Sequence, residues 1–154
     1  MSNIEQTLSI IKPDAVERNL QDQIKIEFES KGFEILKEKK IHISKEEAEN
    51  FYKVHASKPF YNDLCAYLSS GPIVVMCLQR ENAVLENRKL MGSTNPIDAA
   101  PGTIRGDLAM SIGPNLVHGS DSLESAQKEI ALFFSPEEIF DYERDIDHWL
   151  NEAP

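Results

Sequence analysis

Long apolar stretches are missing from this chain of 154 residues. No run approaches the roughly 20 apolar residues that a membrane-spanning helix needs. The first residues, Met1 to Glu5, contain no basic segment that leads into an apolar one, so a secretory signal is not expected. These absences predict a protein without a membrane partner.

Cysteine is scarce as well. The two cysteines, Cys65 and Cys77, lie in an apolar helix-like segment and in an apolar strand-like run. We expect two buried, reduced thiols rather than a disulfide, which is typical of a cytoplasmic protein. The histidines are scattered and no cysteine pair has zinc-ligand spacing, so a zinc site is not expected.

Positive charge is also in short supply. Lys and Arg number 16 against 26 Asp and Glu, which gives a formal net charge of −10. This balance argues against non-specific binding to a nucleic acid backbone. It leaves room for an anionic small molecule, because the nearest charges set the field at a local cluster of Lys and Arg.

Two common glycine-rich phosphate-binding motifs are absent. The chain has no Gly-x-x-x-x-Gly-Lys-Ser/Thr and no Gly-x-Gly-x-x-Gly, so any nucleotide is held without a P-loop or a Rossmann turn. The hydrophobic share of 41% is that of an ordinary globular protein. At this length we predict a single domain over residues 1–154.

Apolar periodicity divides the chain into short strands and helices. Strands are predicted over 7–11, 33–43 and 73–78, with a short one before His118. Helices are predicted over 21–31, 59–68 and 82–91, and from Ser44, Ser122 and Ser135 onward. The charged middle of the second strand suits a sheet edge, whereas the continuous apolar run 73–78 suits a central strand.

The order of these elements is close to β-α-β-β-α-β with additions. It favours an α+β fold, an α/β sandwich with a ferredoxin-like antiparallel sheet and added helices. A long loop is expected near 93–114, where three prolines and three glycines interrupt any periodicity. A C-terminal extension follows the last helices.

His118 stands just before a predicted helix start. Asp121 or Ser122 can cap that helix, and Gly119 allows a sharp turn or a positive φ after the histidine. The imidazole then lies beside helix N–H groups that attract anions. It can serve as a general base, a metal ligand or a nucleophile toward a phosphoryl group. Taken alone, the same pattern is also typical of a histidine that closes a turn.

Other polar residues lie near the ends of predicted elements. In most proteins, a single Lys or Arg at such a place is exposed to solvent, and an aromatic residue belongs to the core. A carboxylate that lies off the apolar stripe of a helix is usually exposed to solvent as well. The candidates are Lys12, Arg88, Thr94, Arg105, Tyr52, Phe60 and Glu129.

Several separated blocks, in order over about residues 5–150, give the chain its resemblance to the nucleoside diphosphate kinase family. The blocks are Thr7-Leu8-Ser9-Ile10-Ile11-Lys12-Pro13-Asp14, Lys58-Pro59-Phe60, Ser70-Gly71-Pro72, Asn95-Pro96, residues 101–107 (PGTIRGD), and Asn115-x-x-His118-Gly119-Ser120-Asp121-Ser122. The resemblance implies ping-pong transfer of the terminal phosphate of ATP or another nucleoside triphosphate to a nucleoside diphosphate, which maintains (d)NTP pools.

The resemblance also implies a role for each matching residue. His118 is the nucleophile that becomes phosphorylated, and Glu129 with Ser120 orients its ring. Tyr52 lies beside the transferred phosphate and the histidine. Lys12 contacts the ribose and the same phosphate.

The remaining matches concern nucleotide binding. Arg88, Thr94 and Arg105 match phosphate contacts, and Asn115 matches a ribose contact. Phe60 stacks on the base while Ile112 covers its other face, a mode that tolerates every base.

A magnesium ion is implied to arrive with the nucleotide, held mainly by phosphate oxygens and water, with no firm protein ligand. A homo-oligomer, hexamer or tetramer, is implied too. The chain departs from the family at Asp22, Arg80 and Pro114, which bears on loops and subunit contacts.

Two alternatives compete with this enzyme. One is a ferredoxin-like nucleotide-binding regulator that has lost catalysis, although the nucleophile and its supporting residues are all present here. The other is a ferredoxin-like RNA-binding domain, which the negative charge and the lack of an aromatic pair on a basic strand disfavour.

Overall fold

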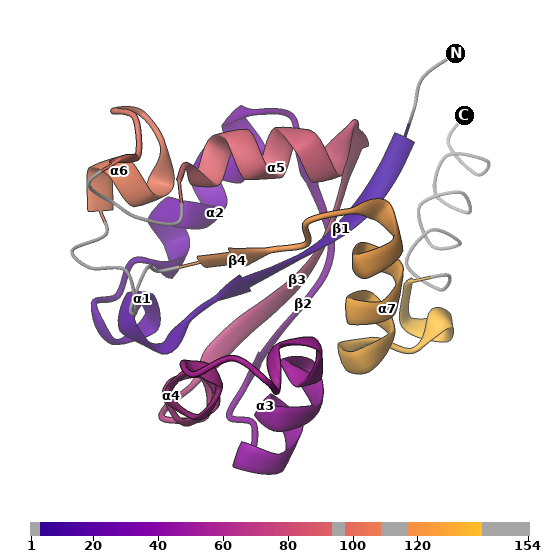
Figure 1. The fold of residues 1–154 in the computed structure, drawn as a ribbon. Helices are drawn as coiled ribbons and strands as arrows, with labels where there is room; N and C mark the ends of the chain where they lie inside the picture. The colour runs from indigo at the N-terminus through magenta and orange to yellow at the C-terminus, as the bar shows by residue number, and fades with distance from the viewer. Residues whose placement is uncertain (1–3, 94–97, 109–116, 140–154) are drawn as a thin grey trace.

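A four-stranded antiparallel sheet forms the centre of the molecule (Figure 1). The computed structural model describes residues 4–93, 98–108 and 117–139. The strands lie in the order β2-β3-β1-β4. Their bounds are β1 Ile4–Ile11, β2 Glu34–Ile41, β3 Ile73–Glu81 and β4 Val117–Gly119.

Helices cover both faces of the sheet. One face carries α1 (Pro13–Glu17), α2 (Gln21–Ser30), α5 (Ala83–Met91) and α6 (Ile104–Leu108). The other carries α3 (Lys45–Phe51), the 3-10 turn η1 (Lys53–His55), α4 (Tyr61–Leu68) and α7 (Leu123–Phe133), followed by a helical turn at 136–139. Each face therefore has its own apolar core.

This topology confirms the predicted ferredoxin-like α+β fold. The β-α-β-β-α-β unit consists of β1, α1 with α2, β2, β3, α5 and β4, while the α3–α4 hairpin and α7 are the added helices. The apolar strand β3 lies inside the sheet, and successive residues from Ile73 to Leu78 enter the two cores alternately. The charged strand β2 lies at an edge, as predicted.

The structure confirms some of the helix caps predicted from the sequence and contains two short helices that were not predicted. Ser44 and Glu47 form the expected capping box, with bonds of 3.0 and 3.1 Å. Between the two candidate caps of α7, the structure selects Ser122, whose hydroxyl accepts from the Ser125 N–H at 3.1 Å. The helices α1 and α6 were not predicted, because five residues are too few to show a period.

Two departures from the family pattern have a visible place. Arg80 donates to the carbonyl of Lys31, and its guanidinium lies 5.3 Å from the ring centre of Phe33, so it joins the end of β3 to the turn before β2. Asp22 lies in the first turn of α2, where a negative charge interacts favourably with the helix dipole. Pro114 lies outside the described residues.

Both cysteines are buried and reduced. Within the described ranges, no helix combines the length and the hydropathy that crossing a bilayer requires.

Gly119 is required for a different reason from the one predicted. Its φ is not positive, and it lies in β4 opposite Ser9 of β1. A Cβ atom there would lie 2.4 Å from Nδ2 of Asn87 and 2.6 Å from Cε of Met91. Both of these α5 side chains are buried, so glycine is what allows α5 to pack against the strand that carries His118.

Replacing Gly119 by alanine should therefore lower the free energy of unfolding by about 1–3 kcal/mol, the usual effect of overpacking a core. Urea denaturation followed by circular dichroism measures this change. Gly71→Ala is the matched control, because its new Cβ meets only the Cβ of Pro13, at 3.7 Å. Equal stability of the two variants would contradict the close packing of α5 on β4.

Candidate functional site

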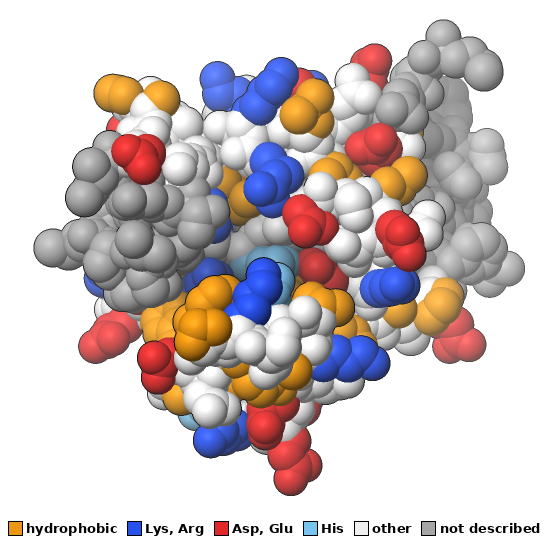
Figure 2. All heavy atoms as spheres, viewed as in Figure 1, with side chains coloured by type: hydrophobic (Ala, Val, Ile, Leu, Met, Phe, Trp, Pro, Cys, Tyr) orange, Lys and Arg blue, Asp and Glu red, His pale blue; other side chains and the backbone are white. Residues whose placement is uncertain are grey.

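His118 is held in the middle of β4, paired with Ile10 of β1. Its side chain remains 20% exposed, although the residues on either side of it in the strand are buried. In the space-filling view, a histidine side chain is visible at the bottom of a depression, between basic and hydrophobic side chains (Figure 2). The sheet thus fixes the imidazole while leaving it accessible.

A carboxylate from α7 engages the imidazole. Oε1 of Glu129 lies 2.7 Å from Nε2 of His118 and accepts from the hydroxyl of Ser120 at 3.0 Å. Ser120 is in turn tied to β1, because its N–H donates to the Leu8 carbonyl at 3.3 Å. When Nε2 donates its proton to Glu129, the lone pair of the neutral ring is on Nδ1.

Burial lowers the pKa of His118, and the nearby positive charges of Lys12 and Arg105 act in the same direction. Glu129 opposes this effect through its hydrogen bond and its charge. The net result is an imidazole that is neutral at neutral pH and therefore has a lone pair available for attack.

Two cations border the histidine, one at the end of β1 and one on α6. Lys12, at the end of β1, is 5% exposed. Burial and the charge of Arg105 lower its pKa to about 8, while Asp14 acts against them. Arg105, on α6, donates to the carbonyls of Gly92 and Val117 at 3.0 and 2.7 Å, so its guanidinium is held in place. Burial and the charge of Arg88 lower the pKa of Arg105 to about 10.

These cations repel one another without substrate, and a bound polyanion would relieve that repulsion. A cavity of about 530 Å³ lies beside Arg105. Its lining consists of Arg88, Lys89, Met91, Gly92, Ser93, Asp98, Ala100, Thr103 and Arg105. Arg88 and Arg105 both line this cavity.

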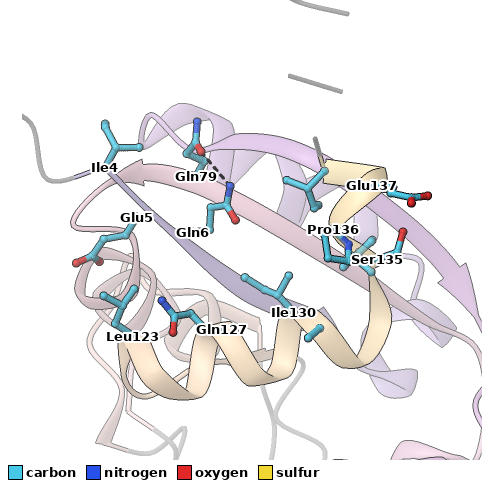
Figure 3. A pocket seen from close by; sticks show the side chains of 13 residues that line it. Ile4, Glu5, Gln6, Gln79, Leu123, Gln127, Ile130, Ser135, Pro136 and Glu137 are labelled. Atoms are coloured by element: carbon cyan, nitrogen blue, oxygen red, sulfur yellow. Dashed lines mark hydrogen bonds between the residues drawn. The ribbon is translucent and has the colours of Figure 1, made fainter. Parts of the chain in front are cut away.

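A second groove, of about 810 Å³, has different chemistry (Figure 3). It runs between β1 and α7, lined by Ile4 on the strand and by Leu123 and Ile130 on the helix. Within it, Gln6 donates to Gln79 at 3.3 Å. Its described lining contains no Lys, Arg or His. It is therefore not suited to a nucleotide.

A row of rings leads from His118 to the surface. Phe51 packs edge-on against His118 with 5.0 Å between ring centres, and Tyr52 packs against Phe51 at the same distance. His55 follows at 6.3 Å from Tyr52, and Phe60 at 6.2 Å from His55. The Phe60 residue is 46% exposed at the outer end of this row, next to Lys58, so its ring is available for stacking.

The structure brings most of the predicted site residues together. The contacts and charges described above link seven of them, and Phe60 lies at the rim. The seven are Lys12, Tyr52, Arg88, Arg105, His118, Ser120 and Glu129. Thr94, Ile112 and Asn115 lie outside the described residues. Sequence reasoning missed Phe51, which positions the His118 ring, because its helical spacing is that of any core residue.

Comparison with known proteins identifies the family of this chain. A family profile described as nucleoside diphosphate kinase matches residues 5–139. The chain belongs to the nucleoside diphosphate kinase family. It is 59% identical over 136 residues to the nucleoside diphosphate kinase of a Nitratiruptor species, covering 88% of this chain and 99% of that protein.

Two further relatives extend the comparison. The nucleoside diphosphate kinase of Desulforamulus reducens is 49% identical over 149 residues, covering 97% of this chain and 100% of that protein. The crystal structure of the Aquifex aeolicus nucleoside diphosphate kinase superposes with a TM-score of 0.86 at 40% identity, covering 88% of this chain and 98% of that one. The resemblance noted from the sequence blocks is confirmed.

Glu129→Gln should lower the pKa of His118 further, because a neutral amide no longer stabilises the imidazolium. NMR titration of the histidine Cε1–H resonances measures this pKa. Glu124→Gln is the matched control on the same helix, since Glu124 is exposed and pairs with Lys128, at 3.3 Å. An unchanged titration in Glu129→Gln would contradict the coupling between the two side chains.

Proposed function

We propose that this chain transfers the terminal phosphate of ATP, or of another nucleoside triphosphate, to a nucleoside diphosphate through phosphorylated His118. The observation that carries the proposal is a neutral, partly exposed imidazole oriented by Glu129 and bordered by Lys12 and Arg105. Membership of the nucleoside diphosphate kinase family supports the same reaction.

In the first step, the lone pair of the imidazole attacks the γ-phosphorus in line with the leaving group. An N–P bond forms, the bond from phosphorus to the bridging oxygen breaks, and the nucleoside diphosphate leaves with that electron pair. Glu129 stabilises the positive charge that develops on the ring. The second nucleoside diphosphate then attacks the phosphohistidine, so one site serves donor and acceptor in turn.

The phosphates would be held by Lys12, Arg88 and Arg105, with Thr94 as a further predicted contact. Charge and fork geometry suit a group whose negative charge is spread over three oxygens. Burial raises the pKa of Tyr52, so its hydroxyl keeps its proton and can donate to the same group.

The nucleoside would be held mainly by shape. Phe60 offers an exposed ring on which the base stacks. Ile112 on the other face of the base, and Lys12 with Asn115 at the ribose, complete this proposed site.

A divalent metal, Mg²⁺, would come with the nucleotide. In the part of the chain that the structure describes, no group of three His, Cys, Asp or Glu residues could hold a metal ion. Arg88 and Arg105, which line the cavity, instead fit phosphate oxygens, which can themselves hold Mg²⁺. When bound there, the ion neutralises charge on the phosphates.

Nothing favours a catalytically silent regulator. Such a protein would lack the nucleophile or its supporting residues, whereas here His118, Ser120 and Glu129 form one hydrogen-bonded unit.

We further propose that residues 1–154 form one domain and that the chain assembles as a homo-oligomer, either a hexamer or a tetramer. We propose a cytoplasmic location, in keeping with the reduced thiols. We propose no nucleic acid partner, in keeping with the net charge of −10.

His118→Ala should abolish phosphoryl transfer while the protein still binds nucleotide. Incubation of the wild-type chain with γ-labelled ATP should give a protein-bound label that is lost in acid and stable in base, as expected for phosphohistidine. The variant should carry none. His42→Ala is the control, because His42 lies away from the site and bonds the carbonyl of Ser69, at 2.8 Å. Label on Ser120 or Ser122 would contradict the proposal.

Phe60→Ala should weaken binding of all nucleotides about equally, by roughly 1–3 kcal/mol, because a stacking ring does not distinguish bases. Isothermal titration calorimetry with adenine, guanine and pyrimidine diphosphates measures this loss. Val54→Ala removes another exposed apolar side chain from the same hairpin and serves as the control. A loss confined to one base would show that Phe60 reads base identity.

A further inference from the structure

One side chain joins the α3–α4 hairpin to the residues that follow Lys12. The hydroxyl of Tyr67, on α4, donates to the carboxylate of Asp14 and accepts from the backbone N–H of the same residue at 3.4 Å. The two residues are 53 positions apart in the chain. A single phenol hydroxyl therefore fixes both the backbone and the side chain of Asp14.

Asp14 and Lys12 belong to one short helical turn. The Lys12 carbonyl accepts from Ala15 and Val16 at 3.0 and 3.1 Å and so begins α1. A Cβ on Gly71, in the turn after α4, would lie within contact distance of Pro13. The end of the hairpin thus lies close to the turn that holds Lys12.

The charge of Asp14 has a specific effect on Lys12. Lys12 is buried beside cations, and Asp14 is the neighbour whose charge favours its ammonium form. Charged and titratable groups from several elements act on Lys12, either directly or through one of its neighbours. They are Asp14 on α1, Arg105 on α6 with Arg88 of α5 behind it, His118 on β4 with Glu129 of α7 behind it, Tyr52 after α3, and Tyr67 on α4.

We propose that Asp14 and Tyr67 form a positioning pair for phosphoryl transfer, in which Tyr67 orients the Asp14 carboxylate and Asp14 keeps Lys12 charged and in place. Neither residue need touch the nucleotide. A phenol that donates to a carboxylate stabilises its negative charge, and that charge offsets the repulsion between Lys12 and Arg105. The pair also makes the state of Lys12 depend on the hairpin that presents Phe60.

The sign of the pH dependence follows from these charges. Lys12 loses its proton as the pH rises through about 8, and a neutral amine no longer attracts phosphate. Removing the negative charge of Asp14 disfavours the ammonium form, so the pKa of Lys12 falls and phosphate binding is lost at lower pH.

The test is a direct titration of Lys12 by NMR in the substrate-free protein labelled with ¹³C-lysine, with the resonance assigned by Lys12→Arg. We expect Asp14→Asn to lower the pKa of Lys12 by about 0.5–1 pH unit, and Tyr67→Phe to lower it less. In both variants, the high-pH limb of the kcat/KM profile should shift to lower pH together with the pKa of Lys12.

Two matched variants separate positioning from a general loss of structure. Tyr61→Phe removes a hydroxyl from the same helix, one that bonds the Glu49 carbonyl at 3.1 Å within the hairpin. Asp22→Asn removes the same charge from the exposed start of α2. Both should leave the titration of Lys12 unchanged.

The inference rests on the proposed role of Lys12 at the phosphate, but the titration needs neither substrate nor phosphohistidine. A Lys12 pKa that is the same in wild type, Asp14→Asn and Tyr67→Phe would overturn the positioning pair. So would an equal shift in Tyr61→Phe. Failure of the labelling of His118 would instead overturn the proposed function and leave the titration result standing.

Discussion

Everything at the site depends on one carboxylate that joins two elements. Glu129 reaches from α7 to His118 and Ser120 on and beside β4, and Ser120 is bonded to β1. These hydrogen bonds hold the imidazole and tie α7 to the sheet. A glutamate that a helical wheel would leave in solvent therefore joins the helix to the strand that carries His118.

The second constraint is the concentration of positive charge in an acidic protein. Lys12 and Arg105 are both buried, and each lowers the stability of the charged form of its neighbours. Such a cluster costs free energy in the unliganded protein, because desolvation and like-charge repulsion add. Backbone carbonyls that accept from Arg105, and Asp14 beside Lys12, offset part of this cost. In the proposed function, bound phosphates would offset the rest.

Much of the fold could be predicted from sequence because its signals are local. The apolar run of β3, the charged middle of β2 and the Ser44 capping box each act within a few residues, and each was read correctly. The contacts of the site are not local. Glu129 looked solvated, Phe51 looked like ordinary core, and the need for glycine at 119 comes from Asn87 and Met91 of a distant helix. Only the family resemblance brought the catalytic candidates together in advance.

The two helical layers contribute different parts of the site. Cations come from α5, α6 and the end of β1, while the row of rings and the carboxylate come from α3, α4 and α7, and His118 lies on the strand between them. Neither helical layer by itself carries all the residues of the proposed site. Enzymatic activity therefore reports on the completed tertiary structure: during refolding it should return only after both layers have docked, later than helix content, and a partly folded chain should not consume nucleoside triphosphates unproductively.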